Sequence, residues 1–181
     1  MQPLNLNEII EGCQSNDRDC QKALYDKYAA TMLGVCQRFA RHNQEAEDML
    51  HDGFIQVFEN IDQYNRLGSF GSWVRRLMIN TCLNHIRRFS YQKELIGIEE
   101  MQMARVDPEV MQQFSEKELL KMIDKLPLGY KHVFNLYAIE GYNHREIAAM
   151  LGIEEGTSRS QLLKARKLLK KFISNALSTL I

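Results

Sequence analysis

The chain has 181 residues, of which 45% are hydrophobic and 25% charged, and its 23 Lys and Arg balance its 23 Asp and Glu. This length and apolar content suit one ordinary domain or two small ones and exclude a wholly disordered chain. No stretch approaches the ~20 apolar residues that a membrane-spanning helix needs, and no basic segment followed by an apolar run marks a secretion signal. We therefore expect a soluble, cytoplasmic protein without membrane insertion.

The neutral total hides a segregation of charge along the chain. Residues 66–93 and residues 156–181 each hold six Lys or Arg and no acid, which leaves 11 cations and 23 acids for the rest. Binding of a polyanion depends on local potential and counterion release rather than on total charge. Two basic patches on an acidic body therefore indicate nucleic-acid binding, and the acidic remainder serves either solubility or a basic protein partner.

The four cysteines form no CxxC pair, and the five histidines do not fall at zinc-finger spacing from them. We expect reduced, mostly buried thiols and no metal or cofactor. A redox-sensing role for Cys13 and Cys20 is an alternative that no pattern supports.

Helical periodicity predominates from end to end, with only three prolines and no alternating stretch that would predict a strand. The sequence thus predicts an all-α protein. The helices are expected at residues 6–14, 17–40, 44–60, 69–89, 109–125, 129–140, 145–151 and 157–177. Between Ser90 and Pro108 the periodicity weakens and acids accumulate, which predicts a flexible linker over 93–109 between two small helical domains, 1–92 and 110–181.

The helix predicted over residues 44–60 has a broad apolar face and an acidic opposite face, and no Lys or Arg occurs between Arg41 and Arg66. We interpret the acids as a docking surface for a basic partner. A magnesium site of a nuclease, built from Glu47, Asp48 and Asp52, is the less economical alternative.

The helix predicted over residues 69–89 carries Arg76, Asn80, Asn84 and Arg87 at roughly helical spacing. Asparagine is unfavourable in a helix interior, whereas amides beside arginines match base edges and phosphates. The face therefore predicts contact with nucleic acid, although an ordinary solvated face would have the same spacing.

A turn-rich segment, residues 61–72, precedes that helix. We expect Tyr64 and Phe70 in a mobile loop there, available to an extruded base. The single tryptophan, Trp73, shares a helical register with Leu77 and is expected to anchor the core, with stacking on an unpaired base as the alternative.

Residues 141–171 predict two short helices joined by a tight turn at Gly152 and Ile153. The second helix is expected to start near Gly156, with Thr157 as its N-cap. Its cations surround an apolar stripe, as in a helix that enters a DNA major groove. They are Arg159, Lys164, Arg166, Lys167, Lys170 and Lys171.

With these residues in place, the chain resembles the extracytoplasmic-function (ECF) sigma factors, small two-domain members of the bacterial sigma-70 class. AEDMLHDGFIQVF (residues 46–58) is similar to the helix of region 2.2, and FGSWVRRLMINTCLNHIRR (residues 70–88) to the helix of regions 2.3 and 2.4. Residues 126–171 are similar to region 4, a four-helix, winged-helix-like unit that contains a helix-turn-helix.

The resemblance implies an RNA polymerase sigma factor, not an enzyme, that directs promoter-specific initiation. Its partners would be promoter DNA, the β′ clamp helices and β flap of core RNA polymerase, and an anti-sigma factor that masks both domains. Core polymerase would be bound by Asp48, Asp52 and Gln56. The minus-10 element would be contacted by Tyr64, Arg66, Ser69, Phe70, Arg75, Arg76, Asn80, Asn84, Arg87 and Arg88. The minus-35 element would be contacted by Arg145, Thr157, Arg159, Ser160, Gln161, Lys164 and Lys167.

Three positions depart from the family pattern and bear on which promoter is read. Ser158 and Gln161 replace a common apolar residue and an arginine, and Asn84 replaces a frequent aspartate. Gln161 would pair with adenine, where an arginine favours guanine.

Two other classes of protein are alternatives. A dimeric helix-turn-helix regulator would share the recognition helix but leaves the acidic helix and the second basic face unexplained. An enzyme lacks support, because the sequence shows no phosphate-binding glycine loop, no zinc-binding His/Glu pair and no nucleophile with its base.

Overall fold

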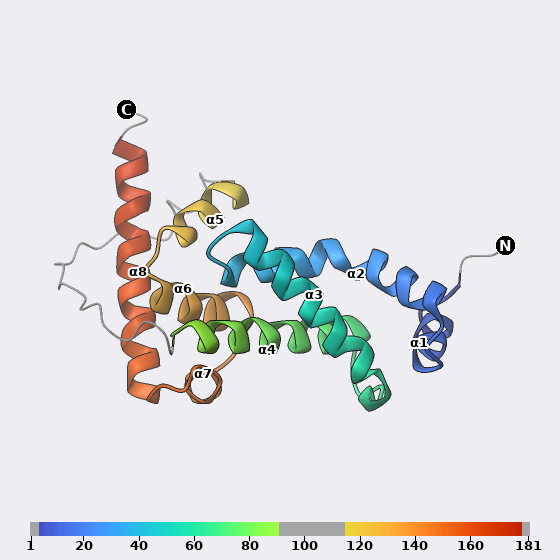
Figure 1. The fold of residues 1–181 in the computed structure, drawn as a ribbon. Helices are drawn as coiled ribbons and strands as arrows, with labels where there is room; N and C mark the ends of the chain where they lie inside the picture. Colours follow the sequence, from blue (N-terminus) through green and yellow to red (C-terminus); the bar gives the residue numbers. More distant parts are fainter. Residues whose placement is uncertain (1–3, 91–114, 179–181) are drawn as a thin grey trace. The chain divides into compact units, whose positions relative to one another are not determined.

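The structure is a computed structural model that describes residues 4–90 and 115–178, except for the side chains of residues 88–90, 116, 117 and 178. The chain divides into two compact units, residues 1–94 and 95–181 (Figure 1). Every regular element in the described ranges is helical, so the all-α prediction is confirmed. No described helix is long and apolar enough to cross a bilayer.

The N-terminal unit contains α1 (Leu6–Gln14), α2 (Arg18–Phe39), α3 (Asn43–Glu59), a 3₁₀ turn η1 (Ile61–Gln63) and α4 (Phe70–Ser90). Side chains before the first helices fix their starts: Asn5 and Glu8 form a capping box on α1, and Asp17 accepts a hydrogen bond from the Cys20 amide of α2. The predicted ends of these four helices agree with the structure to within one residue. The short turn η1 was not predicted, since three residues show no periodicity.

Helices α2, α3 and α4 pack against one another in pairs, and α1 packs on α2 (Figure 1). Their shared core is fully buried and apolar. It includes Leu24, Met32, Val35, Phe39, Met49, Phe54, Val57, Val74, Met78 and Ile79. Gly53 on α3 marks a close approach to α4, because a Cβ there would lie 2.1 Å from the Met78 sulfur. The long helices therefore hold each other along their length through apolar contacts.

The C-terminal unit contains α5 (Glu116–Asp124), α6 (Leu128–Phe134), a π-helical turn η3 (Asn135–Ile139), α7 (His144–Leu151) and α8 (Glu155–Ser178). Its core gathers Ile123, Leu126, Tyr130, Ala165 and Leu169. No strand occurs in residues 115–178, so the four-helix form of the C-terminal prediction applies and a wing is not found there.

Two predicted helices differ from the structure in this unit. The helix predicted over 129–140 is α6 followed by the π turn, whose inserted residue leaves no mark on the periodicity of so short a segment. The start predicted at residue 109 for the preceding helix lies outside the described residues, as does the predicted linker over 93–109.

The helix-turn-helix is confirmed, but the start of its second helix was misplaced. Gly152 ends α7 with a left-handed φ of 68°, which produces the predicted turn. Helix α8 begins at Glu155, so Thr157 lies inside its first turn and is not its N-cap. Threonine is a common N-cap residue, which is why the sequence pointed to Thr157.

All four cysteines are free and buried, as predicted. The Cys82 thiol lies 3.8 Å from the Cys36 sulfur between α4 and α2. Burial, with Cys20 and Asp17 close by, raises the pKa of Cys13 to about 11. A thiol with so high a pKa carries little thiolate at neutral pH, which argues against a redox-sensing role for Cys13.

Candidate functional site

The three predicted docking residues of α3 lie one turn apart on its exposed side. Gln44 Nε2 lies 3.5 Å from Asp48 Oδ1, and Gln56 Nε2 donates to Glu59 Oε2 at 2.8 Å. Asp52 differs from its neighbours, because its carboxylate lies 2.7 Å from His85 Nε2 on α4. This contact joins the acidic helix to the polar one.

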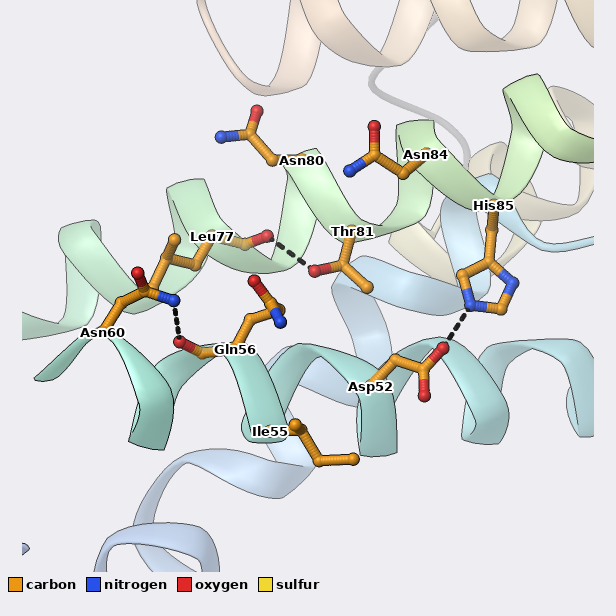
Figure 2. A pocket seen from close by; sticks show the side chains of 9 residues that line it. All are labelled: Asp52, Ile55, Gln56, Asn60, Leu77, Asn80, Thr81, Asn84 and His85. Carbon is orange, nitrogen blue, oxygen red and sulfur yellow. Dashed lines mark hydrogen bonds and ion pairs between the residues drawn. The ribbon is translucent and has the colours of Figure 1, made fainter.

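A groove of about 410 Å³ runs between α3 and α4 at this contact. Most of its lining is polar and uncharged, and all of it comes from the C-terminal half of α3, with its C-cap Asn60, and from the middle of α4 (Figure 2). The lining residues are Asp52, Ile55, Gln56, Asn60, Leu77, Asn80, Thr81, Asn84 and His85. Figure 2 shows Asn80 and Asn84 on the same side of α4, pointing away from α3, whereas His85 points toward α3.

The polar face predicted on α4 is present at the surface. Arg76, Asn80, Asn84 and Arg87 are exposed, and Arg75 is half-buried. The side chain of Arg88 lies outside the described residues. Because α4 is packed on α2 and α3, the exposed amides are carried on a rigid support.

The segment between η1 and α4 is built by its own polar contacts. The Tyr64 hydroxyl donates to the Gly68 carbonyl at 2.7 Å, and the Leu67 amide donates to Asn65 Oδ1 at 3.1 Å. Arg66, with a φ of 61°, reaches Glu11 of α1 at 3.0 Å. The loop thereby presents Leu67, which is 87% exposed. Sequence reasoning missed Leu67, although an apolar residue inside a polar, glycine-containing loop is a usable signal.

Phe70 corrects the prediction for this loop. It is the first residue of α4 and only 3% exposed, because the rings of Tyr28, Tyr64 and Trp73 surround it at centroid distances of 5.8, 5.0 and 5.4 Å. Its ring is therefore not available to an extruded base in this conformation. Trp73 is half-buried in the same cluster, which agrees with an anchoring role.

Ser69 stands at the start of α4 and stabilises it. Its hydroxyl accepts from the Ser72 amide at 3.1 Å, as an N-cap residue does. Ser69 thus lies beside the free backbone amides at the N-terminus of α4. These amides favour binding of an anion such as phosphate.

Helix α8 exposes most of the side chains predicted to meet duplex DNA. Arg159, Ser160 and Lys164 are exposed, while Thr157 and Lys167 are half-buried. Arg145 is exposed on α7. Arg159 pairs with Glu155 one turn earlier on the same helix. Leu163, 55% exposed on the same stretch, was not singled out from the sequence.

Gln161 is placed differently from the prediction. It is half-buried, and its amide lies against α6, where a Cβ at Gly129 would be 3.4 Å from Gln161 Oε1. The absence of a side chain at Gly129 admits the glutamine, so its amide is not directed outward in this conformation. Ser158 is fully buried, and its hydroxyl lies 2.9 Å from His144 Nδ1.

Residues 4–90 and 115–178 contain no group of three His, Cys, Asp or Glu side chains close enough to hold a metal ion. Glu47, Asp48 and Asp52 therefore do not form the magnesium site considered for a nuclease.

Comparison with known families gives the identity of the two units. Residues 24–90 match sigma-70 region 2, and residues 116–169 match sigma-70 region 4. The chain belongs to the sigma-70 family. It is an ECF sigma factor that directs transcription initiation, with core RNA polymerase and DNA as its partners, and it is not itself a catalyst.

Curated relatives resemble the chain over most of its length. The RNA polymerase sigma-H factor of Pseudomonas aeruginosa is 26% identical over 181 residues, which cover 91% of each chain. The ECF RNA polymerase sigma factor SigW of Bacillus subtilis is 27% identical over 178 residues, covering 92% of this chain and 95% of SigW.

Among solved structures, the sigma factor RpoE of Bartonella quintana, in complex with the anti-sigma factor NepR, has a similar fold. The TM-score is 0.52 at 16% identity, covering 84% of this chain and 96% of RpoE.

Proposed function

We propose that this sigma factor divides its work among three surfaces. Residues 1–92 bind core polymerase through Asp48, Asp52 and Gln56 and open the minus-10 element through α4 and the loop before it. Residues 110–181 read the minus-35 element as duplex, and 93–109 link the two. The observation that carries the proposal is the opposite chemistry of the adjacent faces of α3 and α4.

The α3 face supports a basic protein partner. Asp48, Asp52 and Gln56 are exposed and in line, and Ile55 beside them is 52% exposed. An apolar side chain among acids is typical of a docking patch, in which the apolar group is buried and the charges set the register. We assign the β′ clamp helices of core polymerase to this patch.

The α4 face and the loop before it support contact with opened DNA. Asn80 and Asn84 present amide donors and acceptors on one side, with Arg76 and Arg87 in the same row. Amides of this kind pair with base edges, and guanidinium groups bind phosphate. Leu67 and the half-buried Tyr64 supply apolar and aromatic surface for an unstacked base.

The N-terminal part of α8 supports contact with duplex DNA. Arg159, Ser160 and Lys164 are exposed, and Arg145 adds an exposed cation on α7, the first helix of the helix-turn-helix. Recognition helices contact base edges with their N-terminal residues. Because Gln161 is turned toward α6, Arg159 becomes the main candidate for direct reading of a base, and Leu163 the candidate for a thymine methyl group.

The proposal extends to place and control. The protein would act in the cytoplasm with core polymerase, and region 4 would contact the β flap. An anti-sigma factor is a further proposed partner, since the structural relative RpoE was solved with one.

Reconstitution with sigma-free core polymerase tests the proposed function. We expect stoichiometric binding and transcripts that start at a defined set of sites on a genomic template, with shared sequence at minus 10 and minus 35. Binding to DNA without core polymerase, as a dimer at an operator, would instead support a helix-turn-helix regulator and contradict the proposal.

A further inference from the structure

Four side chains of the C-terminal unit form a continuous series of contacts that begins and ends on α8. The Ser158 hydroxyl lies 2.9 Å from His144 Nδ1. The His144 ring stacks on the Tyr137 ring, with centroids 4.7 Å apart and planes at 23°. The Arg166 guanidinium lies 5.6 Å from the centroid of the same Tyr137 ring. We call these four residues the α8 anchor.

The anchor draws on α7, the π turn η3 and α8 itself. His144 is the first residue of α7, Tyr137 is the middle residue of the π turn η3, and Ser158 lies at the start of α8. Arg166 follows Ser158 by about two helical turns. One series of contacts thus holds α8 at two points, one in its first turns and one near its middle.

Apolar packing alone does not fix the orientation of α8. Ile147 of α7 and Leu162 and Ala165 of α8 are buried, but apolar contacts have no preferred direction. A hydrogen bond has one, and a fully buried hydroxyl is destabilising when its partner is lost. A serine hydroxyl can donate or accept, so it bonds the ring nitrogen in either tautomer of His144.

The π turn explains how Tyr137 reaches its place. An inserted residue in a helix shifts the direction of the side chains around it, and such turns occur often at functional sites. Tyr137 is half-buried, so one face of its ring meets His144 while the ring still accepts the Arg166 cation.

We infer that the α8 anchor positions the recognition helix and thereby sets which bases its exposed side chains reach. The inference rests on the proposed minus-35 role of α8. The four side chains are positioning residues: they act through the orientation of Arg159, Ser160, Leu163 and Lys164. Small errors in placement are enough to lose base discrimination, because direct readout requires geometry held within about 0.5 Å.

Two variants remove the polar contact with little change in shape. Ser158→Ala deletes the hydroxyl, and His144→Phe keeps a ring to stack on Tyr137 but removes Nδ1. His144→Asn is the conservative variant, because its amide can occupy the place of Nδ1. Ser174→Ala makes the same substitution on the same helix, outside the anchor, and serves as the matched control.

The experiment uses the full chain bound to core polymerase and a duplex DNA pool randomised at the minus-35 position. Wild-type protein first selects a sequence, and each variant is then compared for its affinity ratio between selected and unselected duplexes. Thermal unfolding and binding to unselected DNA at low salt are measured in parallel. The second readout reports phosphate contacts, which do not depend on the exact angle of α8.

We expect Ser158→Ala and His144→Phe each to lower the affinity ratio about tenfold, the size expected for one hydrogen bond. Binding to unselected DNA should be unchanged, and the double variant should lose no more than either single one. His144→Asn should recover part of the ratio, and Ser174→Ala should keep all of it.

Two results would overturn the inference while leaving the proposed function intact. One is a lower unfolding temperature with the wild-type ratio preserved, which would make the contact purely structural. The other is a double variant whose losses add. If wild-type protein selects no sequence at this position, the proposed minus-35 role itself fails, and the inference falls with it.

Discussion

The two units position their functional side chains in different ways. In the N-terminal unit, α3 and α4 are 17 and 21 residues long and pack against each other and against α2. In the C-terminal unit, α8 has 24 residues, but its neighbours α6 and α7 have only seven and eight. Long partners fix a helix mainly through apolar contacts, with the Asp52–His85 contact beside them in the N-terminal unit, whereas short partners leave an orientation that directional polar contacts must set.

The acidic face of α3 gives the largest expected effect and tests whether the rigid unit carries a docking surface. Replacing both Asp48 and Asp52 by lysine should weaken core binding by several kcal/mol, on the order of a hundredfold or more, because like charges would then meet. Co-migration with core polymerase and a binding titration measure this. The control, Asp19→Lys with Asp62→Lys, makes the same change in charge at exposed acids outside α3 and should bind normally. Normal binding of core polymerase by the double lysine variant of α3 would contradict the assignment of this face as the docking surface.

Arg159 tests the other side of the comparison, the reading end of α8. Replacing it by alanine should cost about 1–3 kcal/mol at one or two base pairs and leave the rest of the sequence preference unchanged. Lys171→Ala, an exposed change near the other end of α8, should weaken all sequences alike and reduce the salt dependence. Competition binding with single-base variants of the selected duplex separates the two. A uniform loss for Arg159→Ala would restrict this arginine to phosphate contact.

Gly53 tests whether close apolar packing holds α3 to α4. A Cβ there would lie 2.1 Å from the Met78 sulfur, so Gly53→Ala should destabilise the protein by about 1–2 kcal/mol, with the flexible methionine giving way in part. Gly34→Ala is the matched control on α2, where no atom lies within 4 Å of the new methyl group, and should stabilise by about 0.5–1 kcal/mol. Urea unfolding measures both. Equal free energies of unfolding for Gly53→Ala and Gly34→Ala would show that α3 and α4 are not closely packed at Gly53.

Replacing Glu45 gives the smallest expected effect and tests a buried polar contact in the N-terminal unit. Its carboxylate accepts from the Arg41 amide at 2.6 Å and from the Arg41 guanidinium at 2.8 Å. Burial opposes ionisation, but the bonds from Arg41 outweigh it and hold the pKa of Glu45 below its ordinary value of 4.5. The contact between Glu45 and Arg41 therefore stabilises the folded protein above pH 4.5. This stabilisation is lost as the pH falls through the lowered pKa of Glu45 in the folded state.

Glu45→Gln should accordingly destabilise the protein by about 1 kcal/mol at neutral pH, and the difference from wild type should shrink in acid. Chemical unfolding across the pH range follows this difference. Glu47→Gln, at an exposed position on the same helix, should change little at any pH. A deficit for Glu45→Gln that persists unchanged in acid would rule out the charged contact as its cause.

Much of the fold follows from the sequence, because helical periodicity and capping residues are local signals. They placed α1 to α4 to within one residue and located the turn at Gly152. The π turn and the start of α8 were not foreseen, because one inserted residue leaves no mark on so short a periodicity and because threonine is a common N-cap residue. The family resemblance supplied the site residues as a set, but the placement of single side chains came from packing: Phe70 is enclosed by rings, and Gln161 rests on Gly129.

The contacts of Ser158 show the same limit. In the sequence it is a departure from a family pattern, next to the residues expected to read bases. In the structure it is fully buried against His144, a residue 14 positions earlier that no motif singled out. Which residue lies across a turn from another depends on tertiary structure. Only the fold shows that Ser158 and His144 are in contact.

The contact between Asp52 and His85 has a consequence for how tightly the protein docks. The Asp52 oxygen that contacts the His85 imidazole must give up that contact before it can pair with an external cation, so docking at this oxygen yields only the difference between the two interactions. On the proposed assignment, the histidine acts as a competitor built into the molecule. Its removal would strengthen attachment to the transcription machinery, and wild-type protein would therefore dissociate more readily than its acidic surface alone suggests.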